Sequence, residues 1–165
     1  KFNLEFDLKQ MYETLSDEYI IILRLHYLVS ENLDISEYEG FIYDYSKYEE
    51  IRDLYVISDM LITDYSSVFF DYANLERPMI FYVYDIDNYR DKLRGFYFDF
   101  EKKAPGPLVT TTNELLTAIE NTKTEDFNNV YNTAEFRSRF GALEDGKASQ
   151  RVADEVICYL RNKIV

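Results

Sequence analysis

The chain has 165 residues, of which 47% are hydrophobic, and its 18 basic and 31 acidic residues give a net charge of −13. This length fits one domain with a full core, and this composition excludes a disordered chain. A nucleic-acid backbone or an anionic bilayer is repelled by such a surface, so we expect no nucleic-acid partner. Any anionic ligand must be held by local geometry.

The beginning of the chain predicts a helix followed by a buried strand. Apolar residues recur at helical spacing over residues 8–15, directly after a capping Asp7. The run from Tyr19 to Leu25 is apolar except for Arg24, which is typical of a strand buried on both faces in a parallel sheet.

The next elements continue this alternation of strand and helix. Residues 41–44 are a short strand candidate, and Ser46 with Glu49 forms a capping box that predicts a helix through Val56. The pattern then predicts a strand at residues 60–63, a helix at 66–74, a strand at 79–84 and a short helix at about 88–93.

The last third of the chain is expected to be mostly helical. Gly95 and the Pro105–Pro107 segment mark a long irregular loop, and residues 108–109 are a weak strand. Thr112 is expected to cap a helix through Ile119. Two further helices are expected at about residues 126–140 and 147–163.

Together these elements predict an α/β fold, a Rossmann-like doubly wound parallel sheet. The single Cys158 lies in an apolar helical pattern, which predicts a buried thiol in a reducing compartment. No apolar run approaches the roughly 20 residues that a membrane span needs. The chain begins at Lys1 within a segment typical of the middle of a domain, so we expect a fragment of a longer protein.

Residues 61–72 combine a strand, a short turn and a helix that opens on Ser66 and Ser67. The free amides and the dipole at a helix start favour anions, so this stretch predicts phosphate binding. Asp71 lies one turn from Ser67 on the same helix face, where it can accept hydrogen bonds from sugar hydroxyls. The alternative is that Asp64, Ser66 or Ser67 only caps the helix.

Two further polar groups follow predicted strands, namely Arg24 with His26 and the Tyr84–Asp85 pair. Ligands bind beyond the carboxyl ends of parallel strands, so these groups and the serines can share one crevice. His26 is the only histidine, and it can bind phosphate, act as an acid or base, or be purely structural.

Other chemistries fit the sequence less well. It contains no Gly-rich phosphate loop, no zinc-ligand spacing and no nucleophile elbow around Ser66, so we expect no metal or cofactor. Acidic residues between Asp85 and Glu101 are numerous enough for a divalent cation, although a solvated acidic surface explains them better.

The stretch from Ile57 to Tyr72 resembles the signature of the CDP-glycerol glycerophosphotransferase family, which includes the teichoic acid polymerases and primases. The likeness runs from about Tyr19 to Glu120. Similar stretches lie at Arg24–Tyr27, Glu76–Tyr82, Tyr89–Asp91, Arg94–Phe100 and Ala104–Pro107.

This resemblance implies that residues 1–165 are one nucleotide-donor-binding domain, the C-terminal half of a two-domain, GT-B glycosyltransferase-like enzyme. It implies attack of an acceptor hydroxyl on the β-phosphorus of CDP-glycerol or CDP-ribitol, with release of CMP. The donor-binding positions carry over onto Arg24, Leu25, His26, Ser66, Ser67 and Asp71, and the catalytic role onto His26.

In the family a second catalytic histidine lies in the N-terminal domain, so the isolated chain is expected to be inactive. The acceptor, a polymer or lipid-linked molecule, is expected to bind through that domain, as is the membrane. We expect a cytoplasmic protein, at the inner face of the membrane. A UDP-sugar transferase and a non-catalytic nucleotide-binding module are the alternatives.

Overall fold

The fold is described from a computed structural model, which covers residues 5–25, 33–89, 95–96, 98–124 and 126–163. The elements are, in chain order, α1 (Leu8–Leu15), β1 (Ile21–Leu23), the 3₁₀ turn η2 (Ser36–Tyr38), β2 (Ile42–Asp44), α2 (Ile51–Ile57), β3 (Leu61–Thr63), α3 (Val68–Tyr72), the 3₁₀ turn η3 (Ala73–Leu75), β4 (Met79–Tyr82), α4 (Ile86–Asn88), α5 (Phe100–Lys103), β5 (Leu108–Val109), α6 (Thr112–Asn121), α7 (Phe127–Val130), α8 (Thr133–Phe140) and α9 (Ala148–Lys163).

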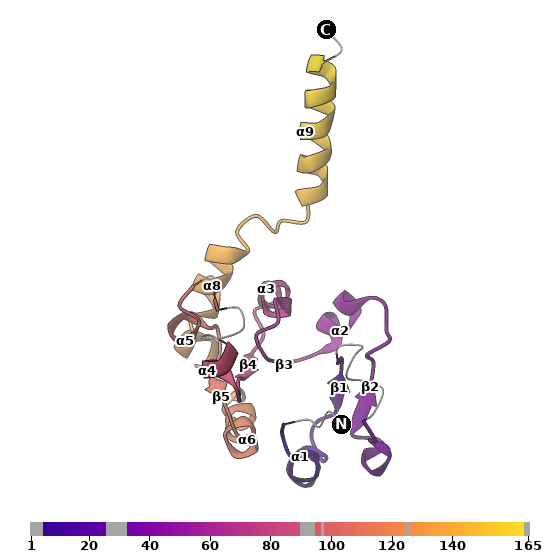
Figure 1. Ribbon diagram of the computed structural model, residues 1–165, viewed down its shortest axis with the longest axis vertical. Coiled ribbons are helices and arrows are strands. Elements are labelled where there is room, and N and C mark those ends of the chain that lie inside the picture. The colour runs from indigo at the N-terminus through magenta and orange to yellow at the C-terminus, as the bar shows by residue number, and fades with distance from the viewer. Residues whose placement is uncertain (1–4, 26–32, 90–94, 97, 125, 164–165) are drawn as a thin grey trace.

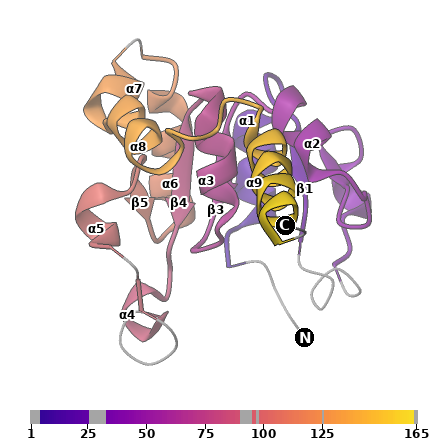
Figure 2. The same ribbon diagram turned by 90° about the horizontal axis from the view of Figure 1, so that it is seen from above.

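All strand pairings in the described part of the chain are parallel, as the buried apolar runs predict. β1 pairs with β2, and β3, β4 and β5 form a second ladder in that order. Across the molecule the strands lie in the order β2, β1, β3, β4, β5 (Figure 1), and Figure 2 shows β1, β3, β4 and β5 in the same order. No backbone hydrogen bond joins β1 to β3 among the described residues, so the sheet is divided at this point.

The central strand β4 separates two hydrophobic clusters because successive side chains of a strand point to opposite faces. Ile80 and Tyr82 belong to one cluster, whereas Met79 and Phe81 belong to the other. The first cluster packs against α1, α6 and α7, and the second against α3, α5 and α8. In Figure 1, α1 and α6 lie below the strands, and α2 and α3 lie above them.

The prediction for the first helix is confirmed, and that for the first strand is partly wrong. Asp7 caps α1 by accepting a hydrogen bond from the backbone N–H of Gln10. β1 is shorter than the apolar run that predicted it, and the side chain of Ile20 is 60% exposed. An apolar run therefore marked the strand without showing that every residue in it is buried.

The predicted capping box before α2 is wrong. Glu50 is the N-cap, and its side chain accepts a hydrogen bond from the N–H of Arg52. Ser46 instead accepts a hydrogen bond at its Oγ from the N–H of Leu25, at 2.9 Å. The serine is used to join the ends of β1 and β2, so it is not available to a helix.

Several predicted boundaries in the second half of the chain also differ from the structure. The expected loop between Gly95 and Pro107 contains the helix α5. The short helix expected at 88–93 begins earlier, as α4, and residues 90–94 lie outside the described part. Thr111, one residue before the predicted cap, opens α6 in a complete capping box with Glu114.

The helix predicted at residues 126–140 is divided into α7 and α8 at Asn132. This residue has a φ of 50°, in the left-handed region that Asn tolerates better than most residues. The helical backbone cannot continue through such a residue, so α8 starts in a new direction.

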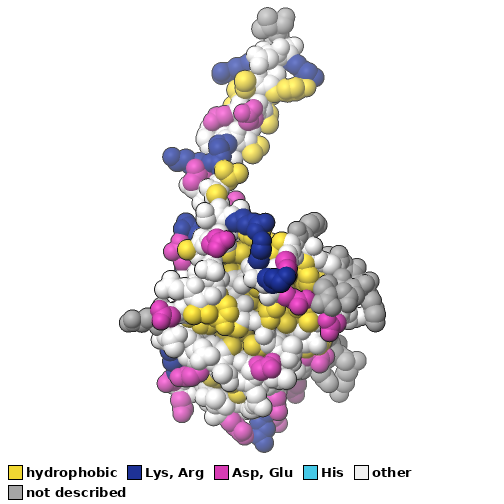
Figure 3. Space-filling model, turned by 90° about the vertical axis from the view of Figure 1, so that its left-hand side faces the viewer, with side chains coloured by type: hydrophobic (Ala, Val, Ile, Leu, Met, Phe, Trp, Pro, Cys, Tyr) yellow, Lys and Arg dark blue, Asp and Glu magenta, His cyan; other side chains and the backbone are white. Residues whose placement is uncertain are grey.

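The C-terminal helix α9 projects away from the strands and has no buried residue (Figures 1 and 3). Hydrophobic side chains lie at its surface, among them Val152 and Val156. Cys158 is exposed, so the prediction of a buried thiol is wrong. The apolar pattern of this helix meets no other element of the described chain. No helix in the described part is both long enough and apolar enough to span a membrane.

Gly106 lies where the segment before β5 passes very close to the start of β4. A Cβ atom added to this glycine would lie 1.9 Å from the carbonyl oxygen of Met79. Only a residue without a side chain fits at that distance. The pairing of β4 with β5 therefore depends on a glycine at this position.

Candidate functional site

The chain changes direction across the sheet between β1 and β3. The connection after β1 leads to β2 on one side, whereas the chain after β3 leads to β4 on the other. Such a switch point leaves a crevice at the carboxyl ends of the two central strands, where open α/β sheets bind ligands. Arg24 and Leu25 follow β1, and Ser66 and Ser67 follow β3. The catalytic candidate His26 lies outside the described residues.

The exposed Arg24 is held against the loop that follows β2. Its Nη1 donates hydrogen bonds to the backbone carbonyls of Tyr45, at 3.5 Å, and of Tyr48. The neighbouring Leu25 contributes its backbone N–H to Ser46, as described above. The end of β1 therefore presents a positively charged side chain that is positioned by carbonyls, and whose charge also acts on the carboxylate of Glu50.

The turn between β3 and α3 leaves both serine hydroxyls unused. Oδ1 of Asp64 accepts a hydrogen bond from the N–H of Ser66 at 2.9 Å. Ser67 is the N-cap of α3, but its side chain makes no capping hydrogen bond. Both serines are exposed, and their hydroxyls have no hydrogen-bond partner among the described residues. The turn is thus stabilised by Asp64, and the described fold makes no use of the two hydroxyls.

α3 itself has five residues, so its dipole is smaller than that of a long helix. The turn therefore offers an anion chiefly the two hydroxyls and the nearby backbone N–H groups. This differs from the sequence prediction, in which the helix start was the main source of attraction.

The pKa of Tyr55 depends on two charged side chains, Asp71 on α3 and Arg24 at the end of β1. Burial raises the pKa of the Tyr55 hydroxyl, the carboxylate of Asp71 raises it further, and the guanidinium of Arg24 lowers it. Both charges therefore act on one side chain, although they come from different halves of the sheet.

Tyr65 connects the β3 turn to the residues that follow β4. Its hydroxyl donates to Oδ1 of Asp85 at 3.0 Å, and its ring stacks on Tyr89 with 4.1 Å between centroids. Burial, followed by the hydrogen bond to Asp85, raises the pKa of Tyr65 far above its usual range, so this phenol stays protonated. Asp85, a predicted crevice residue, is therefore engaged in holding the turn.

The sequence analysis missed both Tyr55 and Tyr65. Tyr55 lies at a core-like position of its helix, and a sequence with 16 tyrosines gives no reason to select one of them. Tyr65 lies between two candidate polar residues, and that position was the available signal. Among the described residues, no three His, Cys, Asp or Glu side chains are grouped so that they could hold a metal ion.

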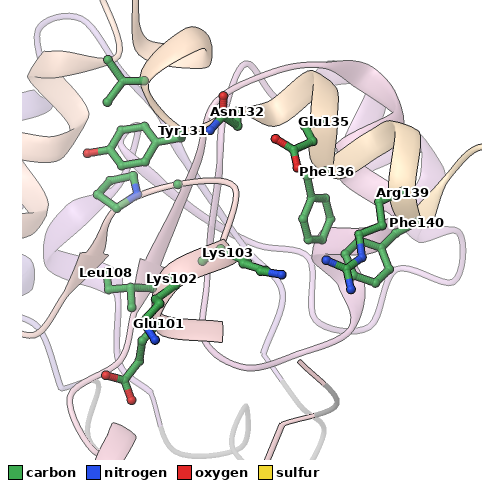
Figure 4. A pocket seen from close by; sticks show the side chains of 14 residues that line it. Glu101, Lys102, Lys103, Leu108, Tyr131, Asn132, Glu135, Phe136, Arg139 and Phe140 are labelled. Atoms are coloured by element: carbon green, nitrogen blue, oxygen red, sulfur yellow. The ribbon is translucent and has the colours of Figure 1, made fainter. Parts of the chain in front are cut away.

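A surface pocket of about 690 Å³ lies elsewhere, between α5 and α8 (Figure 4). The side chains of Lys103 and Arg139 face each other across it, with the ring of Phe136 between them. Its wall includes Gly106 and Leu108, so it adjoins the amino end of β5. Ligands of open parallel sheets bind at the opposite, carboxyl ends. We therefore assign the candidate site to the β1–β3 switch point.

Comparison with known proteins identifies the fold of the chain. A solved structure of the wall teichoic acid polymerase TagF superimposes with a TM-score of 0.85 at 42% identity, over 99% of this chain and 40% of that one. This match confirms the predicted α/β, GT-B-like fold. Another structure of TagF comes from a variant soaked with CDPG.

Curated relatives are similar over nearly the whole chain. The teichoic acid poly(glycerol phosphate) polymerase of Bacillus subtilis (strain 168) is 57% identical over 94% of this chain and 21% of its own length. The teichoic acid glycerol-phosphate transferase of Staphylococcus aureus (strain NCTC 8325 / PS 47) is 47% identical over 94% of this chain and 40% of its own length. The chain therefore spans well under half of these relatives.

The match to a family model extends over residues 1–158, which include both strands of the switch point and the whole of α3. The resemblance first inferred from short motifs is thereby confirmed over most of the chain. The chain belongs to the CDP-Glycerol:Poly(glycerophosphate) glycerophosphotransferase family.

Proposed function

We propose that residues 1–165 are a single nucleotide-donor-binding domain of a longer two-domain transferase, and that the donor is CDP-glycerol. The observation that carries this proposal is the pair of unpartnered hydroxyls, Ser66 and Ser67, at the carboxyl end of β3. The names of two similar relatives, both of which refer to glycerol phosphate, support glycerol over ribitol.

In this proposal the donor diphosphate lies between the two strand ends. Ser66 and Ser67 donate hydrogen bonds to its oxygens, and Arg24 and Leu25 approach it from the end of β1. Hydrogen bonds to charged oxygens are stronger than neutral ones, so a few such contacts can hold a diphosphate on an acidic protein. Asp71 accepts hydrogen bonds from hydroxyls of the ribose or the glycerol.

The proposed reaction transfers glycerol phosphate to an acceptor hydroxyl. The acceptor oxygen forms a bond to the β-phosphorus as the bond from that phosphorus to the bridging oxygen breaks, and the electron pair leaves with CMP. The acceptor hydroxyl gives its proton to a base in the part of the protein outside this chain, and His26 neutralises charge on the diphosphate and protonates the departing CMP. Positioning and charge stabilisation dominate such phosphoryl chemistry.

The remaining partners belong to the full-length protein. We propose that a polymer or lipid-linked acceptor and a second catalytic histidine come from the part outside this chain, so that the isolated chain does not turn over. We also propose a cytoplasmic location at the inner face of the membrane. The net charge of −13 makes this chain a poor partner for an anionic bilayer, which supports membrane contact through the rest of the protein.

Isothermal titration of the full-length protein with CDP, CDP-glycerol, CDP-ribitol and UDP tests the donor assignment. We expect CDP-glycerol to bind most tightly. Tighter binding of UDP would instead indicate a UDP-sugar transferase, and an absence of binding by all four would indicate a non-catalytic module.

A His26→Ala variant of the full-length protein tests the chemical role of the histidine. We expect turnover to fall by at least about tenfold, since general acid catalysis typically contributes about a hundredfold or more, while the melting temperature stays the same. Turnover close to that of the parent protein would remove His26 from the mechanism.

A further inference from the structure

The surface pocket between α5 and α8 is separate from the candidate donor site (Figure 4). It adjoins the amino end of β5, whereas the donor site lies at the carboxyl ends of β1 and β3. Its volume of about 690 Å³ is within the range of roughly 300–1,000 Å³ that is usual for small-molecule sites. The pocket is therefore large enough for a ligand of its own.

Two cationic side chains face each other in this pocket, Lys103 from α5 and Arg139 from α8 (Figure 4). Lys102 and Arg137, which are cations on the same two helices, are each paired with a carboxylate. Lys103 and Arg139 themselves form no ion pair within the described part of the chain. Like charges repel each other, so an anion between these two side chains would stabilise them both.

The carboxylates near the pocket do not neutralise this pair. Glu101 and Glu135 also line the pocket, but their carboxylates point away from the space between the two cations (Figure 4). Among the interactions that lower the pKa of Asp99, the charge of Lys103 contributes least. The space between Lys103 and Arg139 therefore stays positively charged on a chain whose net charge is −13.

An aromatic wall lies beside the two cations. The ring of Phe136 lies between them and is only 5% exposed, so it is fixed in the hydrophobic cluster around α3 and α8. Phe140 packs against Phe136 with 4.7 Å between centroids, and the guanidinium of Arg139 lies over the Phe140 ring at 5.1 Å. These rings position Arg139 and offer an apolar surface to the organic part of a ligand.

We propose that this pocket binds a small phosphate monoester, with the phosphate between Lys103 and Arg139 and the organic part against the aromatic wall. A phosphate monoester carries a charge of about −1.5 to −2 at pH 7, which matches two cations. A phosphodiester carries only about one negative charge, so it matches them less well. Both cations donate several hydrogen bonds, and such charge-assisted bonds to phosphate are strong.

The size of the ligand follows from the charge of the chain. A long polyanion would be repelled by the acidic surface outside the pocket, whereas a small monoester meets only the local positive charge. The pocket would bind such a ligand whether or not the donor is CDP-glycerol, because no donor-binding candidate lines it.

Calorimetric titration of the full-length protein with glycerol 3-phosphate tests the proposal. The double substitution Lys103→Gln and Arg139→Gln should raise the Kd for glycerol 3-phosphate at least about tenfold, because charged hydrogen bonds to the phosphate are lost. Glutamine keeps much of the length of each side chain, so the melting temperature without ligand should stay the same. The Kd for CDP-glycerol should not change.

The matched control is the double substitution Lys147→Gln and Arg137→Gln. It also removes two positive charges, one of them from α8, but neither residue lines the pocket. The Kd for glycerol 3-phosphate should equal that of the parent protein. Ser66→Ala with Ser67→Ala should also leave this Kd unchanged while weakening the binding of CDP-glycerol, so a failure of the donor assignment is distinguishable from a failure of the pocket.

A second ligand, glycerophosphoglycerol, tests the preference for a monoester. This phosphodiester should bind more weakly than glycerol 3-phosphate because it carries less charge. The proposal is overturned if the parent protein does not bind glycerol 3-phosphate, or if the control double variant loses as much affinity as Lys103→Gln with Arg139→Gln. Equal binding of the diester and the monoester would overturn it as well.

Discussion

Two turns of this molecule share one sequence pattern and differ in what their polar groups do. Each leads from a parallel strand into a helix that begins with a hydroxyl residue, Ser67 for α3 and Thr111 for α6. At α6 the pattern forms a complete capping box. Thr111 accepts from the N–H of Glu114, and the Glu114 carboxylate accepts from the N–H groups of Thr110 and Thr111.

At α3 the corresponding hydroxyl makes no capping hydrogen bond. A carboxylate before the helix, Asp64, instead accepts a hydrogen bond from the N–H of Ser66. The hydroxyls of Ser66 and Ser67 are therefore not needed to stabilise the turn. The comparison shows that a hydroxyl residue at a helix start serves the fold only where its oxygen is engaged. An unengaged hydroxyl at the carboxyl end of a strand is a better candidate for binding.

The largest expected effect is a loss of activity when the serines of the turn before α3 are replaced. The double substitution Ser66→Ala and Ser67→Ala in the full-length protein should lower kcat/KM for CDP-glycerol by about a hundredfold, since each hydroxyl contributes a hydrogen bond to a charged phosphate. The melting temperature should stay the same because no fold contact is lost. Steady-state kinetics and thermal unfolding measure both, and a stability loss without an activity loss would contradict the comparison.

Asp71→Asn tests whether the ligand-binding surface extends from the serine turn one helical turn into α3. The substitution keeps the size of the side chain but removes its charge, so KM for CDP-glycerol should rise by roughly tenfold. Asp59→Asn is the matched control, because this exposed aspartate precedes β3 at its amino end. Equal effects of the two variants on KM would mean that net charge, and not position, accounts for the change.

Thr111→Ala tests whether the hydroxyl at the start of α6 stabilises the fold without contributing to donor binding. Loss of the capping hydrogen bond should lower the free energy of unfolding by about 1 kcal/mol, and donor binding by the folded protein should not change. Urea unfolding and donor titration measure these quantities. Thr117→Ala, in the exposed middle of the same helix, should have almost no effect. A change in donor affinity for Thr111→Ala would break the distinction between the turns.

Glu50, the cap of α2, provides the smallest and most pH-dependent effect. Its hydrogen bonds from Arg52 lower the pKa of this carboxyl from 4.5 to about 2. Its stabilising contribution is therefore complete above pH 4.5 and is lost as the pH falls toward 2. Exposed ion pairs contribute little, so the effect should be small and sensitive to salt.

Unfolding by urea between pH 5 and pH 2 checks this expectation, with Glu50→Gln compared with the parent protein. The parent should lose more stability across this range than Glu50→Gln does, because the variant lacks the group that titrates. Glu49→Gln, an exposed neighbour, serves as the control. Identical acid sensitivity of the parent and Glu50→Gln would refute this account of the cap.

Much of the fold could be predicted because strand and helix patterns depend on local sequence. The apolar runs located the parallel strands, and the spacing after Asp7 located α1. The prediction of local contacts was weaker where one side chain has two possible hydrogen-bond partners. Ser46 could cap a helix or join two strands, and only the approach of Leu25 decides the second outcome.

The candidate site was predictable in its strand-end positions and not in its internal contacts. Ser66 and Ser67 were selected because they open a helix shortly after a predicted strand, and they do follow β3, one of the two strands at the switch point. Tyr65 could not be selected, because its contacts with Asp85 and Tyr89 form only when the turn after β3 packs against the residues that follow β4. The environment of Cys158 was missed because an apolar helical pattern does not reveal what covers it.

Gly106 changes how the family signature is interpreted. The Ala104–Pro105–Gly106–Pro107 segment is part of the resemblance, yet its glycine serves the contact between β4 and β5 and lies far from the candidate chemistry. A survey of all substitutions should find this position as intolerant as the serines, but with loss of folded protein in place of loss of turnover. Motif membership alone therefore does not distinguish residues that build the sheet from residues that bind the ligand.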